Sequence, residues 1–144
     1  MPSGFANGIN VKVVTACTLT VTQVTFQNTC VTGVRNIIQL YTNYSGSCTA
    51  SAGAPALNDI VVNGFYSTSP MSGADINLYG YSSADPIVAY FGNLKITGSY
   101  SMDTSSPPQY GTYYLDNVNG FTPAGTGITN STFSINGSVP SCAF

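Results

Sequence analysis

The side chains that could perform acid–base chemistry in this 144-residue chain are five aspartates, because the chain has no histidine and no glutamate. Acid–base catalysis needs two such groups held on either side of the reacting bond, and no two of these aspartates are adjacent. Asp59 and Asp75 could approach one another across repeats, but we expect turn capping and Asx hydrogen bonds from the whole set. A serine nucleophile would lack its histidine base. The sequence therefore predicts no catalytic residue. The aspartates are Asp59, Asp75, Asp85, Asp103 and Asp116.

Positive charge is equally scarce, with three lysines and arginines and a net charge of −2. No basic surface exists to hold nucleic acid or anionic lipid, so neither partner is expected. Lys12 lies in the strand-like stretch "GINVKVV" and has two interpretations. It can bind an anionic ligand as a point charge, or it can be an edge-strand charge that discourages aggregation. Ten tyrosines and no tryptophan offer rings that stack on sugars and hydroxyls that hydrogen-bond them.

The cysteines indicate an oxidising compartment. Their number is even, they form no CxxC pair, and there is no histidine to complete a zinc site, so we expect two disulfides, no metal and no cofactor. Cys17 with Cys30 is the more local pairing, which leaves Cys48 for Cys142. Asn43, Asn130 and Asn136 begin N-glycosylation triplets. The chain shows neither a leader nor an apolar stretch near ~18 residues, so we expect an extracellular protein whose leader has been removed and no membrane partner.

The elements that must position these residues are strands. "TLTVTQVTF" alternates polar and apolar residues, and similar stretches follow between Gly, Pro, Asn and Ser. Three stretches superimpose at offsets of 34 and 39: "DIVVNG" (59–64), "NLKITG" (93–98) and "TFSING" (132–137). A fourth, "QVTFQN" (23–28), precedes "DIVVNG" at an offset of 36. "NIIQLY" (36–41) aligns with "DINLYG" (75–80) as a second unit. The pattern predicts one all-β domain over residues 1–144, a parallel β-solenoid with Asn and Gly at its corners. An antiparallel sandwich is the alternative.

Four stretches in order resemble polygalacturonases, the glycoside hydrolase family 28. Members of that family typically read Gly-hydrophobic-Arg-Ile-Lys, then V-x-N-V-T-F-x-N, then a strand ending in a Tyr-containing loop, then I-S-D-I-x-F-x-N. This chain has "GINVK", "VTQVTFQN", "IIQLYTNY" and "LNDIVVN" in the same order, and the match covers about residues 7 to 100. The resemblance implies a right-handed parallel β-helix, here of about four to six coils, that corresponds to the later coils of the family.

The resemblance also implies a site. Lys12 aligns with a family lysine that binds galacturonate carboxylates, and Asn10 stands where the family has arginine, so the bidentate fork of that arginine is lost. Tyr44 ends the next aligned strand and is expected to contact the sugar. The family's Asn-Thr-Asp, Asp-Asp and Gly-His-Gly motifs would precede the Lys12 strand and do not occur in this chain.

Three functional classes therefore remain open. The first is a β-helix that binds pectic or another polysaccharide without cleaving it. The second is the C-terminal portion of an active glycoside hydrolase whose catalytic coils lie elsewhere, which the intact mass of the natural protein would reveal. The third is a structural, self-associating extracellular protein, because an end coil of unpaired strand edges is a template for homo-oligomers or stacked assemblies.

Overall fold

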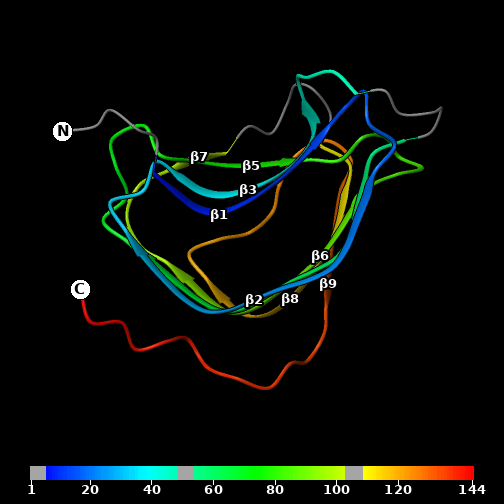
Figure 1. Cartoon of the computed structure of the whole chain (residues 1–144). Helices are drawn as coiled ribbons and strands as arrows, with labels where there is room; N and C mark the ends of the chain where they lie inside the picture. Colours follow the sequence, from blue (N-terminus) through cyan, green and yellow to red (C-terminus); the bar gives the residue numbers. More distant parts are fainter. Residues whose placement is uncertain (1–5, 49–53, 103–108) are drawn as a thin grey trace.

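The computed structural model describes residues 6–48, 54–102 and 109–144, and its regular elements are β-strands (Figure 1). Within these residues no helix is long and apolar enough to cross a membrane. The strands are β1 (Asn7–Val14), β2 (Thr20–Thr32), β3 (Asn36–Tyr44), β4 (Ala56–Thr68), β5 (Asp75–Tyr79), β6 (Ile87–Ile96), β7 (Ser101–Met102), β8 (Gly111–Asn119) and β9 (Ile128–Thr132).

The strands form two sheets between which the chain alternates. Sheet A has the order β1-β3-β5-β7, and sheet B has the order β2-β4-β6-β8-β9. Every neighbouring pair in both sheets is parallel. From β1 to β8 each strand is followed by one in the other sheet, which is the course of a chain that winds through successive coils. The predicted all-β class with parallel strands is confirmed, and the antiparallel sandwich is excluded.

Apolar side chains fill the space between the two sheets in columns that run across the strands. Ile9 pairs with Ile38, and Ile38 pairs with Ile76, and none of the three is more than 1% exposed. In sheet B, Val62 pairs with Phe91, and both are fully buried. The period-two alternation of the sequence therefore separates a core face from a solvent face on each strand.

Sheet B bends where a column of residues takes up left-handed backbone conformations. Asn28, Gly64, Asn93 and Asn117 occupy this bend, one on each successive strand, and their φ angles lie between 50° and 81°. Asparagine and glycine are the residues that tolerate this conformation best. Side-chain amides bond along the bend, because Asn117 Nδ2 donates to Asn93 Oδ1 and Asn93 Nδ2 donates to Asn63 Oδ1, both at 2.9 Å.

The repeat predicted from the sequence is right in one place and wrong in others. "QVTFQN" does lie beside "DIVVNG", since Val24 pairs with Ile60. The alignment of "DIVVNG" with "NLKITG" is wrong, because Asn63 pairs with Gly92 rather than with Thr97. The coil between these strands is shorter than the sequence match requires. "TFSING" begins at the last residue of β9 and continues outside any strand.

The last residues of the chain form a strap, residues 133–144, over the outer face of sheet B (Figure 1). The backbone N–H of Ile135 donates to Asp116 Oδ2 on β8, and Asn63 Nδ2 on β4 donates to the carbonyl of Asn136, both at 2.9 Å. At the far side, Cys142 is bonded to Cys30 on β2. The strap therefore crosses the strands of sheet B from β8 to β2.

Both disulfides exist, but the pairing expected from the sequence is wrong. The bonds are Cys17–Cys48 and Cys30–Cys142, and no cysteine is free. Cys17 follows β1 and Cys48 follows β3, and these strands are neighbours in sheet A, so the two cysteines occupy equivalent places in adjacent coils. Distance along the chain misleads here because parallel coils bring residues about one coil apart into contact. The expected anchoring of Cys142 to the body is confirmed, with Cys30 as its partner.

Removing the Cys30–Cys142 bond should cost more stability than removing Cys17–Cys48. The sequence separations are 112 and 31 residues, and the chain-entropy model then gives a difference of about 1 kcal/mol in the free energy of unfolding. Denaturant unfolding of the two double serine variants measures it. Equal losses, or a larger loss for Cys17→Ser/Cys48→Ser, would show that strain or residual structure outweighs loop closure.

Tyr113 is a polar group buried in the core. Its side chain is fully buried, its ring stacks on Phe91 at 5.7 Å, and its hydroxyl has no hydrogen-bond partner among the described residues. Gly111 makes room for this ring, because a Cβ there would lie 2.4 Å from the ring edge. Burial raises the pKa of Tyr113 well above its usual value.

Tyr113→Phe should therefore stabilise the protein, by about 1 kcal/mol at neutral pH, because it removes an unpaired buried hydroxyl. Because the pKa of Tyr113 is raised in the folded protein, the unfolded chain loses the hydroxyl proton at a lower pH than the folded protein does. Titration of this group therefore leaves the free energy of unfolding unchanged below about pH 10 and lowers it at higher pH by up to about 1.4 kcal/mol per pH unit. Unfolding curves between pH 8 and 11 should show the variant's advantage growing above pH 10. Tyr114→Phe, which removes the hydroxyl of a neighbouring half-buried tyrosine, is the control. Parallel pH profiles for all three proteins would contradict the assignment.

Candidate functional site

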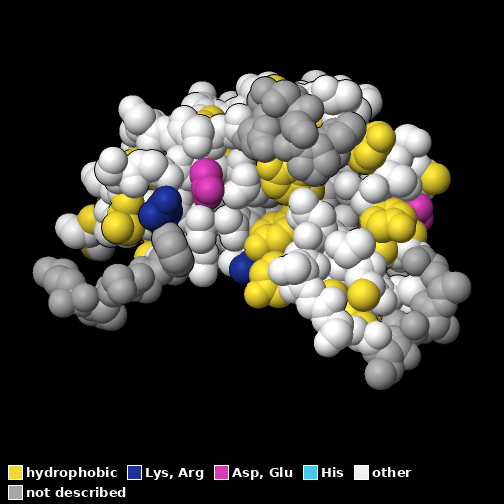
Figure 2. Space-filling view, turned by 90° about the horizontal axis from the view of Figure 1, so that it is seen from above, with side chains coloured by type: hydrophobic (Ala, Val, Ile, Leu, Met, Phe, Trp, Pro, Cys, Tyr) yellow, Lys and Arg dark blue, Asp and Glu magenta, His cyan; other side chains and the backbone are white. Residues whose placement is uncertain are grey.

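The three residues predicted to bind a ligand lie together on sheet A. Asn10 and Lys12 alternate along β1 with the buried Ile9 and Val13, so they face outward. Tyr44 is the last residue of β3, the next strand in the sheet. Figure 2 views the molecule from above, and its surface there is mainly neutral, with patches of hydrophobic side chains and few charged groups.

Lys12 lies between two tyrosine rings. Its Nζ is 5.4 Å from the ring centroid of Tyr41 and 4.9 Å from that of Tyr44, and the two rings meet edge to face at 6.1 Å. Each cation–π contact at an exposed site contributes roughly 0.5–1 kcal/mol. Lys12 remains exposed and forms no ion pair with any described residue. Its ammonium is therefore held in place while its N–H groups can still meet an anion.

A column of amides runs beside this cluster. Asn10 is in register with Gln39, and Gln39 with Asn77. Asn10 Nδ2 donates to Gln39 Oε1 at 3.3 Å, whereas Asn10 Oδ1 is buried without a partner among the described residues. The sheet A face thus carries a cation and two rings next to neutral hydrogen-bonding groups.

The sequence predicts a ligand-binding role for Lys12, Asn10 and Tyr44, but it does not place Tyr41 and Gln39 beside them. Tyr41 pairs directly with Lys12 in the β1–β3 ladder. The repeat unit "NIIQLY" carries a signal for this placement, although the sequence match pairs it with "DINLYG" and not with the Lys12 strand. Extending that repeat back to β1 would have placed Tyr41 beside Lys12.

The structure does not gather the described aspartates into one site. Asp59 is exposed on β4 in sheet B, and Asp75 begins β5 in sheet A, so the proposed pair is split between the sheets. Asp85 closes a turn by hydrogen bonds with Ser82 at 3.1 Å, and Asp116 accepts the bond from the strap. Asp103 lies outside the described residues. Among those that are described, no three His, Cys, Asp or Glu side chains cluster to hold a metal.

The predicted glycosylation asparagines are all exposed. Asn43 lies near the end of β3 and Asn136 in the strap. Asn130, on β9, donates its side-chain amide to the carbonyl of Pro123 at 2.8 Å. Attachment of a sugar at Asn130 would have to accommodate this hydrogen bond.

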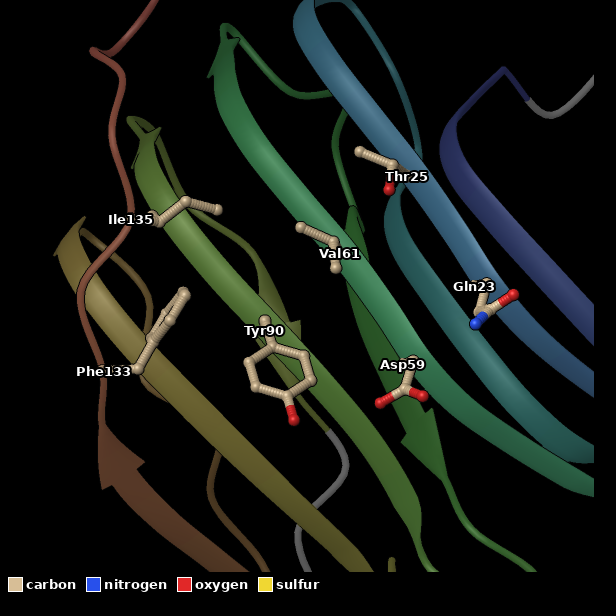
Figure 3. Close-up of a pocket in the computed structure, with 7 residues that line it drawn as sticks. All are labelled: Gln23, Thr25, Asp59, Val61, Tyr90, Phe133 and Ile135. Atoms are coloured by element: carbon tan, nitrogen blue, oxygen red, sulfur yellow. The ribbon is translucent and has the colours of Figure 1, made fainter.

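A groove of about 490 Å³ lies on the other sheet, between the strap and the outer face of sheet B. Asp59 and Gln23 lie on one side of it, and Phe133 and Ile135 of the strap on the other (Figure 3). The remaining lining residues are Thr25, Val61 and Tyr90. None of the residues predicted to bind a ligand lines this groove.

Two parallel sheets joined coil by coil, with aromatic rings, amides and one lysine on an outer face, define a parallel β-strand protein. The family model for glycosyl hydrolases family 28 matches residues 3–112. The chain belongs to this family, whose fold is the parallel β-helix and whose members are typically extracellular. No curated protein and no solved structure matches the chain.

Proposed function

We propose that this protein is a secreted, pectin-directed β-helix that binds acidic polysaccharide on the outer face of sheet A and does not cleave it. Membership of glycosyl hydrolases family 28 supports the polysaccharide class. The observation that carries the proposal is the placement of Lys12 between Tyr41 and Tyr44. A lysine held there, on a face with little other charge, favours a sugar that carries a carboxylate.

Each group on the face has a separate part in binding. The ammonium of Lys12 pairs with a uronate carboxylate as a point charge. The rings of Tyr41 and Tyr44 offer apolar surface to the sugar and hydroxyls at their tips. Asn10 supplies a hydrogen bond but no charge, so binding is weaker than a bidentate guanidinium would give. The surface is therefore suited to reversible contact with a long polymer, in which several weak contacts add up.

The absence of cleavage follows from the carboxylates. Inverting glycosidases place an acid and a base about 6.5–9.5 Å apart across the scissile bond. Among the described residues, Asp75 is the aspartate that belongs to a strand of sheet A, where it begins β5. It pairs with Asn36 on β3 and not with another acid. The two disulfides and the family's typical location support an extracellular protein.

Lys12→Ala should weaken the binding of tetragalacturonate at least tenfold, because the only cation among the rings is lost. Lys95→Ala is the matched control, since Lys95 also lies over a tyrosine ring, with its Nζ 5.5 Å from the centroid of Tyr66, but in sheet B. Titration calorimetry at low and high salt measures both.

No reducing ends should appear from polygalacturonate between pH 4 and 7. Equal affinity for both variants, or turnover that Asp59→Asn or Asp75→Asn abolishes, would refute the proposal.

Self-association is a second candidate function, and the exposure of the end coil favours it. Val24 and Phe26 on β2 face the core but are only half-buried, whereas their partners Ile60 and Val62 on β4 are fully buried. Val11 on β1 is half-buried beside a fully buried Leu40. Within the described residues nothing covers this apolar end, so a second copy can bury it.

Val11→Lys should therefore shift the protein toward monomer, because it places a charge where the second copy would pack. Val13, two residues further along β1, is only 3% exposed and belongs to the core, so Val13→Lys would unfold the protein instead. Sedimentation over a range of concentrations measures the change. A monomer at every concentration, with or without Val11→Lys, would exclude association through this end.

A further inference from the structure

The groove on sheet B has the properties of a second carbohydrate site, and it goes beyond the proposed function because it lies on the opposite sheet from Lys12. From its shape, rings and charge we propose that it binds a neutral, hydroxyl-rich sugar chain. Its volume of about 490 Å³ is within the range of roughly 300–1,000 Å³ typical of ligand sites.

The apolar surface for a sugar ring comes from an interrupted ladder of tyrosines. Val61, Tyr90, Tyr114 and Ser131 pair in succession across β4, β6, β8 and β9. Tyr90 and Tyr114 stack at 4.7 Å with their planes 11° apart. The ladder stops at Val61, so the side of Tyr90 that faces β4 has no ring against it. A pyranose above Val61 and Thr25 would occupy the next place in this stack.

The strap closes one side of the groove and is held firmly. Phe133 meets Tyr90 edge to face at 5.5 Å. Ile135 packs so closely on β6 that a Cβ on Gly92 would lie 2.2 Å from its Cγ2. The hydrogen bond to Asp116 and the disulfide to Cys30 anchor the strap on either side of this contact. The apolar wall is therefore formed before any ligand arrives.

The polar side of the groove carries hydrogen-bonding groups and one negative charge. Gln23 and Asp59 occupy equivalent positions on β2 and β4, both with positive φ, 58° and 52°. Both side chains are exposed and neither has a hydrogen-bond partner among the described residues. No lysine or arginine lines the groove. A carboxylate and an amide suit sugar hydroxyls, whereas a uronate would be repelled by Asp59.

Cellotetraose is a suitable probe, because its equatorial hydroxyls leave C–H groups on both faces of each ring to stack on Tyr90. In amide NMR spectra, cellotetraose should shift Thr25, Val61 and Tyr90, and tetragalacturonate should not. Val61→Tyr should weaken cellotetraose binding at least tenfold, because the new ring fills the place of the sugar. Ser131→Tyr adds the same ring at the other end of the same ladder, outside the groove, and should bind as the parent protein does.

Asp59→Asn keeps a residue that tolerates positive φ and removes only the charge, so it should retain cellotetraose and let tetragalacturonate shift the groove amides. This variant tests the site even where Val61→Tyr fails to fold. Absence of cellotetraose shifts at the groove, or unchanged binding in folded Val61→Tyr, would overturn the inference. Tetragalacturonate shifts at Lys12 and Tyr41 report the proposed function separately, and Lys12→Ala should abolish those while leaving cellotetraose binding intact.

Discussion

Parallel pairing of equivalent strands is the constraint on which the rest of this structure depends. Because each strand lies beside the one from the next coil, residues of one kind gather in columns: isoleucines in the core, amides along a bend and tyrosines outside. A column exists only while the register holds. Lys12 lies beside Tyr41, and Tyr90 beside Tyr114, because the backbone pairing of their strands puts them in register. Both candidate surfaces are therefore consequences of the register.

The sequence was sufficient for features that depend on alternation within one strand. It predicts the all-β class and the alternation of polar and apolar residues along the strands. It also predicts Asn and Gly at coil corners, whereas the structure has Asn28 and Gly64 inside β2 and β4. Features that depend on coil length were not predictable, since loops and bulges change the register without a strong sequence signal. A shift between Asn36 and Ile38 moves "NIIQLY" by one residue against "DINLYG". The coil between β4 and β6 is shorter than the sequence match requires, so Asn63 does not pair with Thr97. The cysteine pairing was wrong because parallel coils bring Cys17 and Cys48 together, although they are 31 residues apart in the sequence.

The strap shows how a segment without regular structure can be determined by the sheet below it. Its side chains enter spaces that the columns leave, as Ile135 does over Gly92. Its backbone bonds to groups that the ladder does not use, such as the side chains of Asn63 and Asp116. These contacts could not be predicted from the sequence, because "TFSING" resembles a strand repeat although all but its first residue lie outside the sheet. The groove could not be predicted either, because the strap forms one of its sides.

Sparse charge gives the two faces their different character. With few ionised groups in the chain, a single lysine or aspartate sets the local potential, since no neighbouring charges of opposite sign neutralise it. Lys12 makes the tyrosine cluster of sheet A attractive to anions, and Asp59 makes the tyrosine ladder of sheet B unattractive to them, although both surfaces are built from the same rings and amides. Parallel coils repeat the shape of a surface, and substitution of one residue in one coil is enough to change the charge that this surface presents.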